Sequence, residues 1–116
     1  MQGMRTTVLV LVLLAGAAVA RAEDANALGK RIYVERCSAC HGDDGRGDGP
    51  AAMALEPKPR NFVDAAFWKG RTQAQVRAVV EHGKPGTMMA PFSGVLSDAE
   101  IDAVVDYVRH FAPPSS

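Results

Sequence analysis

The feature that most constrains this chain is a CxxCH run, CSACH, at residues 37–41. Its cysteines, Cys37 and Cys40, are the only 2 cysteines among the 116 residues. Each thiol can add to one vinyl group of a haem and form a thioether, and the adjacent histidine can then bind the iron. Two intervening residues place the thiols about one helical turn apart on the same side of the chain. The run therefore predicts one haem c, attached covalently through two thioethers, with His41 as an axial ligand.

Two other uses of a CxxC pair compete with this interpretation. A thioredoxin-like redox disulfide needs a framework of strands and helices, and no alternating, strand-like run lies beside the motif. A zinc site needs two further ligands at a second paired spacing, whereas His82 and His110 stand alone in the sequence. Both histidines fall in the last turn of a predicted helix, where a surface position suits an imidazole. The sequence therefore favours haem attachment over both alternatives.

From the haem-binding run outward, residues 26–112 resemble the class I monohaem cytochromes c. The resemblance implies an all-α cytochrome c fold, with three to four helices and long loops wrapped around one covalently attached haem. It also implies a second axial ligand, a methionine supplied by a loop that precedes the C-terminal helix. The stretch GKPGTMMAPF, residues 83–92, resembles that loop.

Two adjacent methionines compete for the iron. Neighbouring residues in an extended segment point to opposite sides, so only one of Met88 and Met89 is expected to reach it. The loop of the family runs methionine, two residues, phenylalanine, and residues 89–92, MAPF, match this order. We therefore predict Met89 as the ligand and keep Met88 as the alternative. Met88 and Met53 are expected to pack within loops.

Capping signals and apolar spacing predict three longer helices. The first covers residues 25–36, and the second covers residues 73–82, with Thr72 as its N-cap. The run SDAE at residues 97–100 is a capping box that opens a third helix, which ends before Pro113. In the family the first and last helices cross near one haem edge, and the residues that fit this crossing are Gly29, Tyr33, Val104 and Tyr107.

The connection over residues 42–70 is rich in glycine and proline, and so long an irregular segment is expected to need a cofactor to order it. In short bacterial members of the family, a proline nine residues after the histidine offers its carbonyl to the imidazole N–H, and Pro50 stands there. A plain turn proline is the alternative. Arg60 is predicted to bind a haem propionate, and Trp68 to donate its indole N–H to the same group. A surface arginine and a core tryptophan are the simpler interpretations.

Residues 1–22 are predicted to be an export signal peptide that is cleaved off. A short basic start is followed by an apolar stretch over residues 6–19 and a small-residue cleavage site, either AVA at residues 18–20 or ARA at residues 20–22. We favour cleavage after Ala22. The apolar stretch is shorter than the roughly 20 residues of a membrane-spanning helix, so we predict a removed signal rather than a retained membrane span. The expected organisation is a signal peptide over residues 1–22 and a cytochrome c domain over residues 23–116, located in the periplasm.

The net charge of the exported chain limits which classes of molecule it can bind. Removing residues 1–22 takes away Arg5 and Arg21, so the 13 Lys and Arg of the full chain fall to 11, against 13 Asp and Glu. A net charge of about −2 leaves no basic excess with which to bind the phosphate backbone. Nucleic acid is therefore excluded, and redox proteins are the expected partners.

The predicted function is one-electron transfer between respiratory or dehydrogenase partners, by a carrier that is not itself an enzyme. A fixed electron-transfer subunit of a larger oxidoreductase is the main alternative. A haem enzyme or ligand sensor with a displaceable methionine is a third possibility. Such chemistry requires a general acid or base above the iron, and we expect no candidate from residues 83–92 other than Thr87.

Overall fold

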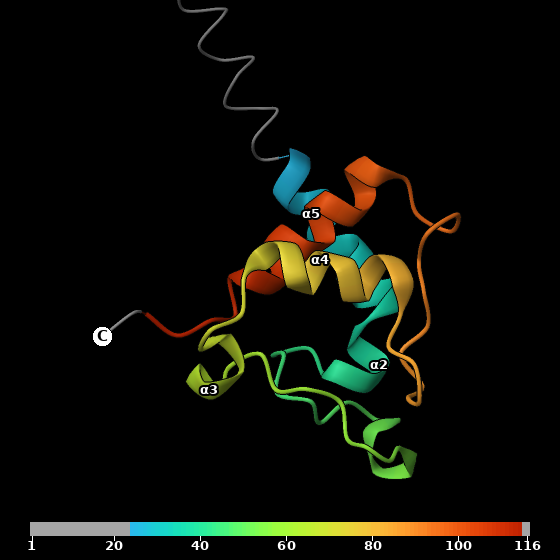
Figure 1. The fold of residues 1–116 in the computed structure, drawn as a ribbon. Helices are drawn as coiled ribbons and strands as arrows, with labels where there is room; N and C mark the ends of the chain where they lie inside the picture. Colours follow the sequence, from blue (N-terminus) through green and yellow to red (C-terminus); the bar gives the residue numbers. More distant parts are fainter. Residues whose placement is uncertain (1–23, 115–116) are drawn as a thin grey trace, which may run out of the picture.

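The computed structural model describes residues 24–114, and within this range the regular structure is helical (Figure 1). An N-terminal helix over residues 24–36 is followed by α2 (Ser38–His41), the 3-10 turn η1 (Ala52–Ala54), α3 (Ala65–Trp68), α4 (Gln73–His82) and α5 (Asp98–Arg109). The described residues contain no strand beyond one isolated bridge, between Ser93 and Leu96. The all-α prediction is confirmed, and the predicted signal peptide, residues 1–22, lies outside the described range.

The two long C-terminal helices begin with the reciprocal bonds that their sequences predict. At α4, Thr72 Oγ1 accepts from the Gln75 N–H at 3.2 Å, and Gln75 Oε1 accepts from the Thr72 N–H at 2.9 Å. At α5, Ser97 and Glu100 exchange the same pair of bonds at 3.1 and 3.0 Å. Each box satisfies two backbone donors that the first helical turn leaves unpaired. The predicted bounds of α4 and the start of α5 are confirmed.

The N-terminal helix crosses α5 where Gly29 meets its backbone. A Cβ atom at Gly29 would lie 2.9 Å from the carbonyl carbon of Ala103 and 3.0 Å from Cβ of Tyr107, so only glycine allows this approach. One turn further along, the ring of Tyr33 packs on Tyr107 with 5.3 Å between the ring centroids. These contacts confirm the predicted helix crossing.

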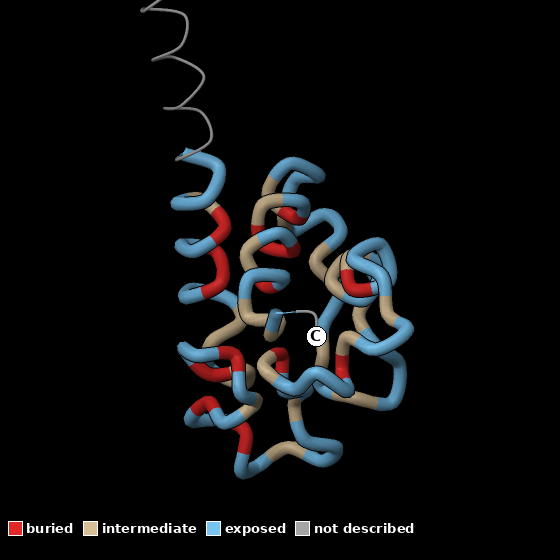
Figure 2. The backbone as a smooth tube through the Cα atoms, turned by 90° about the vertical axis from the view of Figure 1, so that its left-hand side faces the viewer, coloured by how far each residue is buried: buried red, intermediate tan, exposed pale blue. Residues whose placement is uncertain are grey.

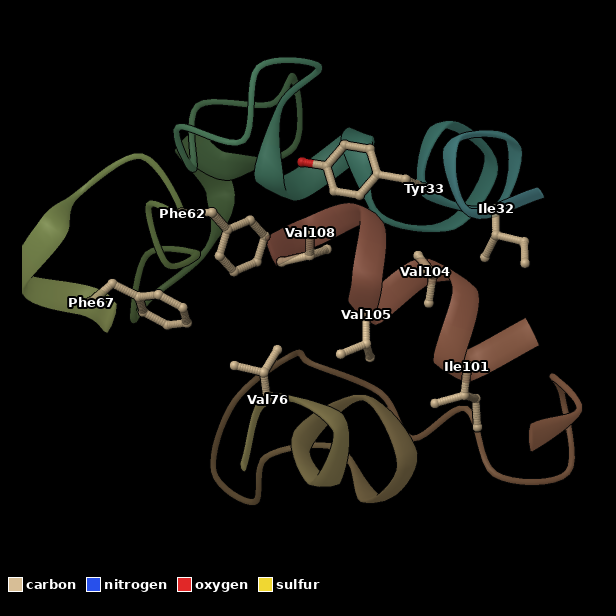
Figure 3. Packing of buried hydrophobic residues seen from close by; sticks show 9 residues of the cluster. All are labelled: Ile32, Tyr33, Phe62, Phe67, Val76, Ile101, Val104, Val105 and Val108. Atoms are coloured by element: carbon tan, nitrogen blue, oxygen red, sulfur yellow. The ribbon is translucent and has the colours of Figure 1, made fainter. Parts of the chain in front are cut away.

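The apolar core lies between the N-terminal helix, α4 and α5, with α5 at its centre (Figure 3). Ile101 and Val104 of α5 are each 1% exposed, and Ile32 of the N-terminal helix is 2% exposed. Burial of such a side chain stabilises the fold by about 1.5–3 kcal/mol. Figure 2 shows buried positions along one side of the N-terminal helix. The core is completed by Tyr33, Phe62, Phe67, Val76, Val105 and Val108.

Two long connections leave this helical core and carry three of the predicted haem-binding residues, Pro50, Arg60 and Met89. Residues 42–64 run through η1 below α2 in the view of Figure 1, and residues 83–97 descend from the end of α4 towards the level of α2 before they return to α5. Across residues 24–114, no helix combines the length and the apolar character that a bilayer crossing requires.

Candidate haem-binding site

The CxxCH residues share one turn of chain at the end of the N-terminal helix. The Cys37 N–H donates to the Tyr33 carbonyl at 2.9 Å, and the His41 N–H donates to the Cys37 carbonyl at 2.9 Å. Both thiols are free and partly exposed. The backbone therefore presents two thiols and one imidazole from consecutive positions of a single turn, as thioether attachment to a porphyrin requires.

The environment of Cys37 suits an uncharged sulfur atom. The side chain packs against the apolar core. Burial, with a smaller contribution from Cys40, raises the pKa of the Cys37 thiol to about 11. Redox-active and metal-binding CxxC motifs instead need a lowered thiol pKa, because the thiolate is their reactive form. A neutral thioether is stable in such a site, and a catalytic thiolate is not.

The imidazole of His41 is held in the tautomer that binds iron. Its Nδ1 lies 3.1 Å from the carbonyl oxygen of Arg60, and because a carbonyl can only accept, Nδ1 carries the proton and Nε2 keeps its lone pair. The ring stacks on Phe62 with 4.5 Å between centroids and 19° between planes. Burial lowers the pKa of His41, and the bond to Arg60 opposes this only in part. The neutral ring is therefore favoured.

The carbonyl that faces His41 belongs to Arg60 and not to Pro50, which corrects the expectation from the sequence. Pro50 is exposed. The chain beside it is instead bonded to α2, because the Gly49 N–H donates to the Cys40 carbonyl at 3.0 Å. A Cβ at Gly49 would lie 2.5 Å from the Ser38 oxygen, so this close approach requires glycine. With residues 49–51 held there, the later segment around Arg60 passes next to the imidazole.

The two predicted propionate ligands have contacts of their own. The indole N–H of Trp68 donates to the Phe62 carbonyl at 2.7 Å, so the structure gives this proton an acceptor within the protein. The expected Trp68 bond to a propionate is therefore replaced by a bond that holds the Phe62 backbone. The guanidinium of Arg60 is exposed and lies 5.5 Å from the ring centroid of Phe67, within reach of solvent.

Tyr33 contributes a contact to the site that the sequence reasoning missed. Its hydroxyl donates to the carbonyl of Gly42, directly after His41, at 2.6 Å, and the residue is 0% exposed. The pKa of this hydroxyl is raised well above its usual range, chiefly because burial disfavours the phenolate. The sequence offered one signal, a tyrosine rather than a phenylalanine at the helix crossing, but not the identity of its acceptor.

The two methionines of the loop differ in exposure. Met88 is 75% exposed, whereas Met89 is partly buried. The Met89 backbone is held at both polar atoms, since its N–H donates to Thr87 Oγ1 at 3.1 Å and its carbonyl accepts from the Lys84 N–H at 3.2 Å. Met53 is 91% exposed, so the expectation that Met53 and Met88 pack within loops is wrong. The two histidines outside the motif, His82 and His110, are both exposed, as predicted.

The family of the chain follows from its sequence match. Residues 26–112 match the family described as Cytochrome c. The chain belongs to the cytochrome c family. Membership confirms the predicted cofactor, a covalently bound haem c, and haem-based electron transfer as the chemistry of this cytochrome. The free cysteine pair, the neutral His41 and the uncharged surroundings of Cys37 all fit that group.

Curated relatives of this cytochrome c include much larger proteins. It is 40% identical over 113 residues to dihydro-heme d1 dehydrogenase of Pseudomonas aeruginosa, and the match covers 96% of the chain and 20% of that protein. It is 34% identical over 83 residues to the cbb3-type cytochrome c oxidase subunit FixP of Bradyrhizobium diazoefficiens, with 72% of the chain and 26% of that protein covered. The chain thus spans about a fifth to a quarter of the length of these relatives.

Solved structures share the fold of this cytochrome c. The KustC0563 c-type cytochrome superposes with a TM-score of 0.61 at 30% identity, covering 73% of this chain and 98% of that chain. The dihydro-heme d1 dehydrogenase NirN in complex with DHE superposes with a TM-score of 0.58 at 36% identity, covering 76% of this chain and 16% of that chain. These similarities confirm the predicted class I cytochrome c fold.

Proposed function

We propose that this cytochrome c is a one-electron carrier whose iron has His41 and Met89 as axial ligands. The observation that carries the proposal is the His41 ring, which keeps Nε2 unprotonated because Nδ1–H is committed to the Arg60 carbonyl. The partial burial of Met89, against the 75% exposure of Met88, supports Met89 as the second ligand.

The protein's part in this function is to hold the ligands still while the bound haem supplies the change of valence. The Arg60 carbonyl orients the imidazole and increases its donor strength. A thioether is a soft, neutral donor, so Met89 would raise the reduction potential relative to a second histidine. The exposed Arg60 side chain remains our proposed ligand for a propionate, through a charge-assisted hydrogen bond.

The cellular setting is part of the same proposal. Residues 1–22 would direct export and be removed, and the cytochrome c domain would act in the periplasm with redox proteins as donor and acceptor. Nucleic acid has no place in this function, because the exported chain carries no basic excess.

A fixed subunit of a larger oxidoreductase is the second candidate function. The observation in its favour is that the matched FixP is a subunit of a cbb3-type oxidase. The match covers about a quarter of the length of FixP. Size-exclusion of the native extract separates the two candidates. Haem absorbance at the mass of the single domain supports a mobile carrier, and co-elution with a large oxidoreductase supports the subunit.

The ligand assignment is tested by the absorption spectrum of the oxidised protein near the iron-thioether charge-transfer band. We expect the band in the parent and in Met88→Ala, and its loss in Met89→Ala. Loss only in Met88→Ala would transfer the role to Met88. Absence of the band in the parent protein would favour a haem enzyme or sensor with an open or displaceable position.

A further inference from the structure

An arginine on α4 binds carboxylates of both helices that bracket the methionine loop. Arg77 Nη1 lies 2.5 Å from Glu81 Oε2, one turn further along α4. Its Nε donates to Asp102 Oδ1 of α5 at 2.6 Å, and its Nη2 lies 3.5 Å from Asp98 Oδ1 at the start of α5. The guanidinium therefore joins the helix that ends at the loop to the helix that begins after it. We call these four residues the Arg77 cluster.

The loop itself folds back onto the last turn of α4. The Phe92 N–H donates to the Val80 carbonyl at 2.9 Å, and the Ser93 N–H donates to the Glu81 carbonyl at 3.0 Å. Glu81 thus takes part twice, with its side chain in the Arg77 cluster and its carbonyl in the return of the loop. A shift of the end of α4 away from α5 would therefore be passed directly to the segment that carries Met89.

The Arg77 cluster joins two partly buried side chains to two exposed ones. The side chains of Arg77 and Glu81 are each 28% exposed, whereas those of Asp102 and Asp98 are 65% and 90% exposed. Hydrogen bonding to Asp102 is the largest cause that raises the pKa of Arg77. An exposed ion pair contributes little, but several carboxylates on one ordered guanidinium form a network with a measurable effect that salt weakens.

We propose that Arg77 is a positioning residue for the axial methionine, holding α4 to α5 so that Met89 stays on the iron. This inference rests on the proposed ligation by His41 and Met89. When the Arg77 cluster is removed, a small neutral ligand such as imidazole should replace the thioether more readily. In that exchange the imidazole nitrogen bonds to iron as the thioether sulfur leaves, and no electron is transferred.

The test is an imidazole titration of the oxidised holoprotein at low ionic strength, followed by loss of the iron-thioether band. We expect Arg77→Gln to raise the apparent imidazole affinity by up to about fivefold, the factor that corresponds to the upper end of the range for exposed ion pairs. Asp102→Asn should give a similar increase, and Arg77→Lys a smaller one. Added salt should raise the affinity of the parent protein and leave that of Arg77→Gln nearly unchanged.

Two controls separate positioning from other effects. Arg31→Gln makes the same charge change at an exposed pair on the N-terminal helix, where Arg31 and Glu35 lie 3.9 Å apart, and should leave the titration unaltered. Gly29→Ala should destabilise the helix crossing without touching the loop, and its imidazole affinity should stay within twofold of the parent.

The outcomes distinguish this inference from the proposed function. Absence of the band in the parent protein would overturn the His41 and Met89 ligation, and the role of Arg77 with it. A parent band with equal titrations for Arg77→Gln and Arg31→Gln would overturn the role of Arg77 alone. An increase in Gly29→Ala as large as that in Arg77→Gln would do the same, because Arg77 would then act only through global stability.

Discussion

Removal of the Tyr33 hydroxyl tests how the N-terminal helix is tied to the haem-binding turn. The hydroxyl is buried and donates to the Gly42 carbonyl at 2.6 Å. Tyr33→Phe deletes this donor and keeps the ring, whose centroid lies 5.3 Å from that of Tyr107 and 5.2 Å from that of Phe111. The substitution therefore isolates one hydrogen bond from the aromatic packing around it.

The expected cost follows from what remains on the acceptor. Leaving a buried carbonyl with no donor costs about 1–3 kcal/mol, whereas the net worth of an ordinary hydrogen bond is about 0.5–1.5 kcal/mol. The Gly42 carbonyl also accepts from the Gly45 N–H at 3.1 Å, so it keeps one partner in the variant. We therefore expect Tyr33→Phe to lower the free energy of unfolding by about 1 kcal/mol.

The assay is thermal unfolding of the holoprotein, followed by far-ultraviolet circular dichroism. A loss of 1 kcal/mol corresponds to a fall of about 4–8 °C in the melting temperature of a domain of this size. Tyr107→Phe is the matched control, because the Tyr107 hydroxyl makes no hydrogen bond within residues 24–114, and its melting temperature should be nearly unchanged. Equal melting temperatures for Tyr33→Phe and the parent, or a loss above about 3 kcal/mol, would refute the reasoning from the shared acceptor.

Three further predictions concern alkaline pH and close packing. Burial raises the pKa of Tyr33 above the unfolded value near 10, so above pH 10 the unfolded state loses a proton that the folded state keeps. The free energy of unfolding should then fall by up to about 1.4 kcal/mol per pH unit. Denaturant titrations should find a shallower fall with pH in Tyr33→Phe than in the parent, and equal slopes against pH would contradict this. Gly29→Ala should cost about 1–3 kcal/mol in urea unfolding, because its Cβ would press on the α5 backbone at Ala103. Gly49→Ala should cost a similar amount of about 1–3 kcal/mol, since its Cβ would meet the α2 carbonyls, and a parent-like urea midpoint would show that this loop can move aside.

The features that the sequence predicts correctly are those built from neighbouring residues. The haem-binding run lies within one turn, so its spacing alone brings Cys37, Cys40 and His41 together. The caps at Thr72 and Ser97 depend on a side chain and a backbone N–H three residues apart, a distance that local geometry determines.

The two hydrogen-bond predictions that needed correction depend on backbone carbonyls that no sequence pattern marks. Every residue has a carbonyl group. The sequence therefore does not indicate that His41 bonds to the carbonyl of Arg60, 19 residues away, rather than to that of Pro50. The acceptor of the Trp68 indole is likewise a backbone carbonyl, that of Phe62. Side-chain identity carries no information about which carbonyl a folded loop brings within reach.

The sequence by itself determined the chemistry of this cytochrome c, because thioether attachment and helix capping are encoded by residue types at short, regular spacings. Only the tertiary structure decided which atoms support that chemistry. The Arg60 carbonyl at His41, the Tyr33 hydroxyl at Gly42 and the 25-residue span from Arg77 to Asp102 arise when separate segments pack together. Their partners are selected by the shape of the assembled core and not by any local pattern.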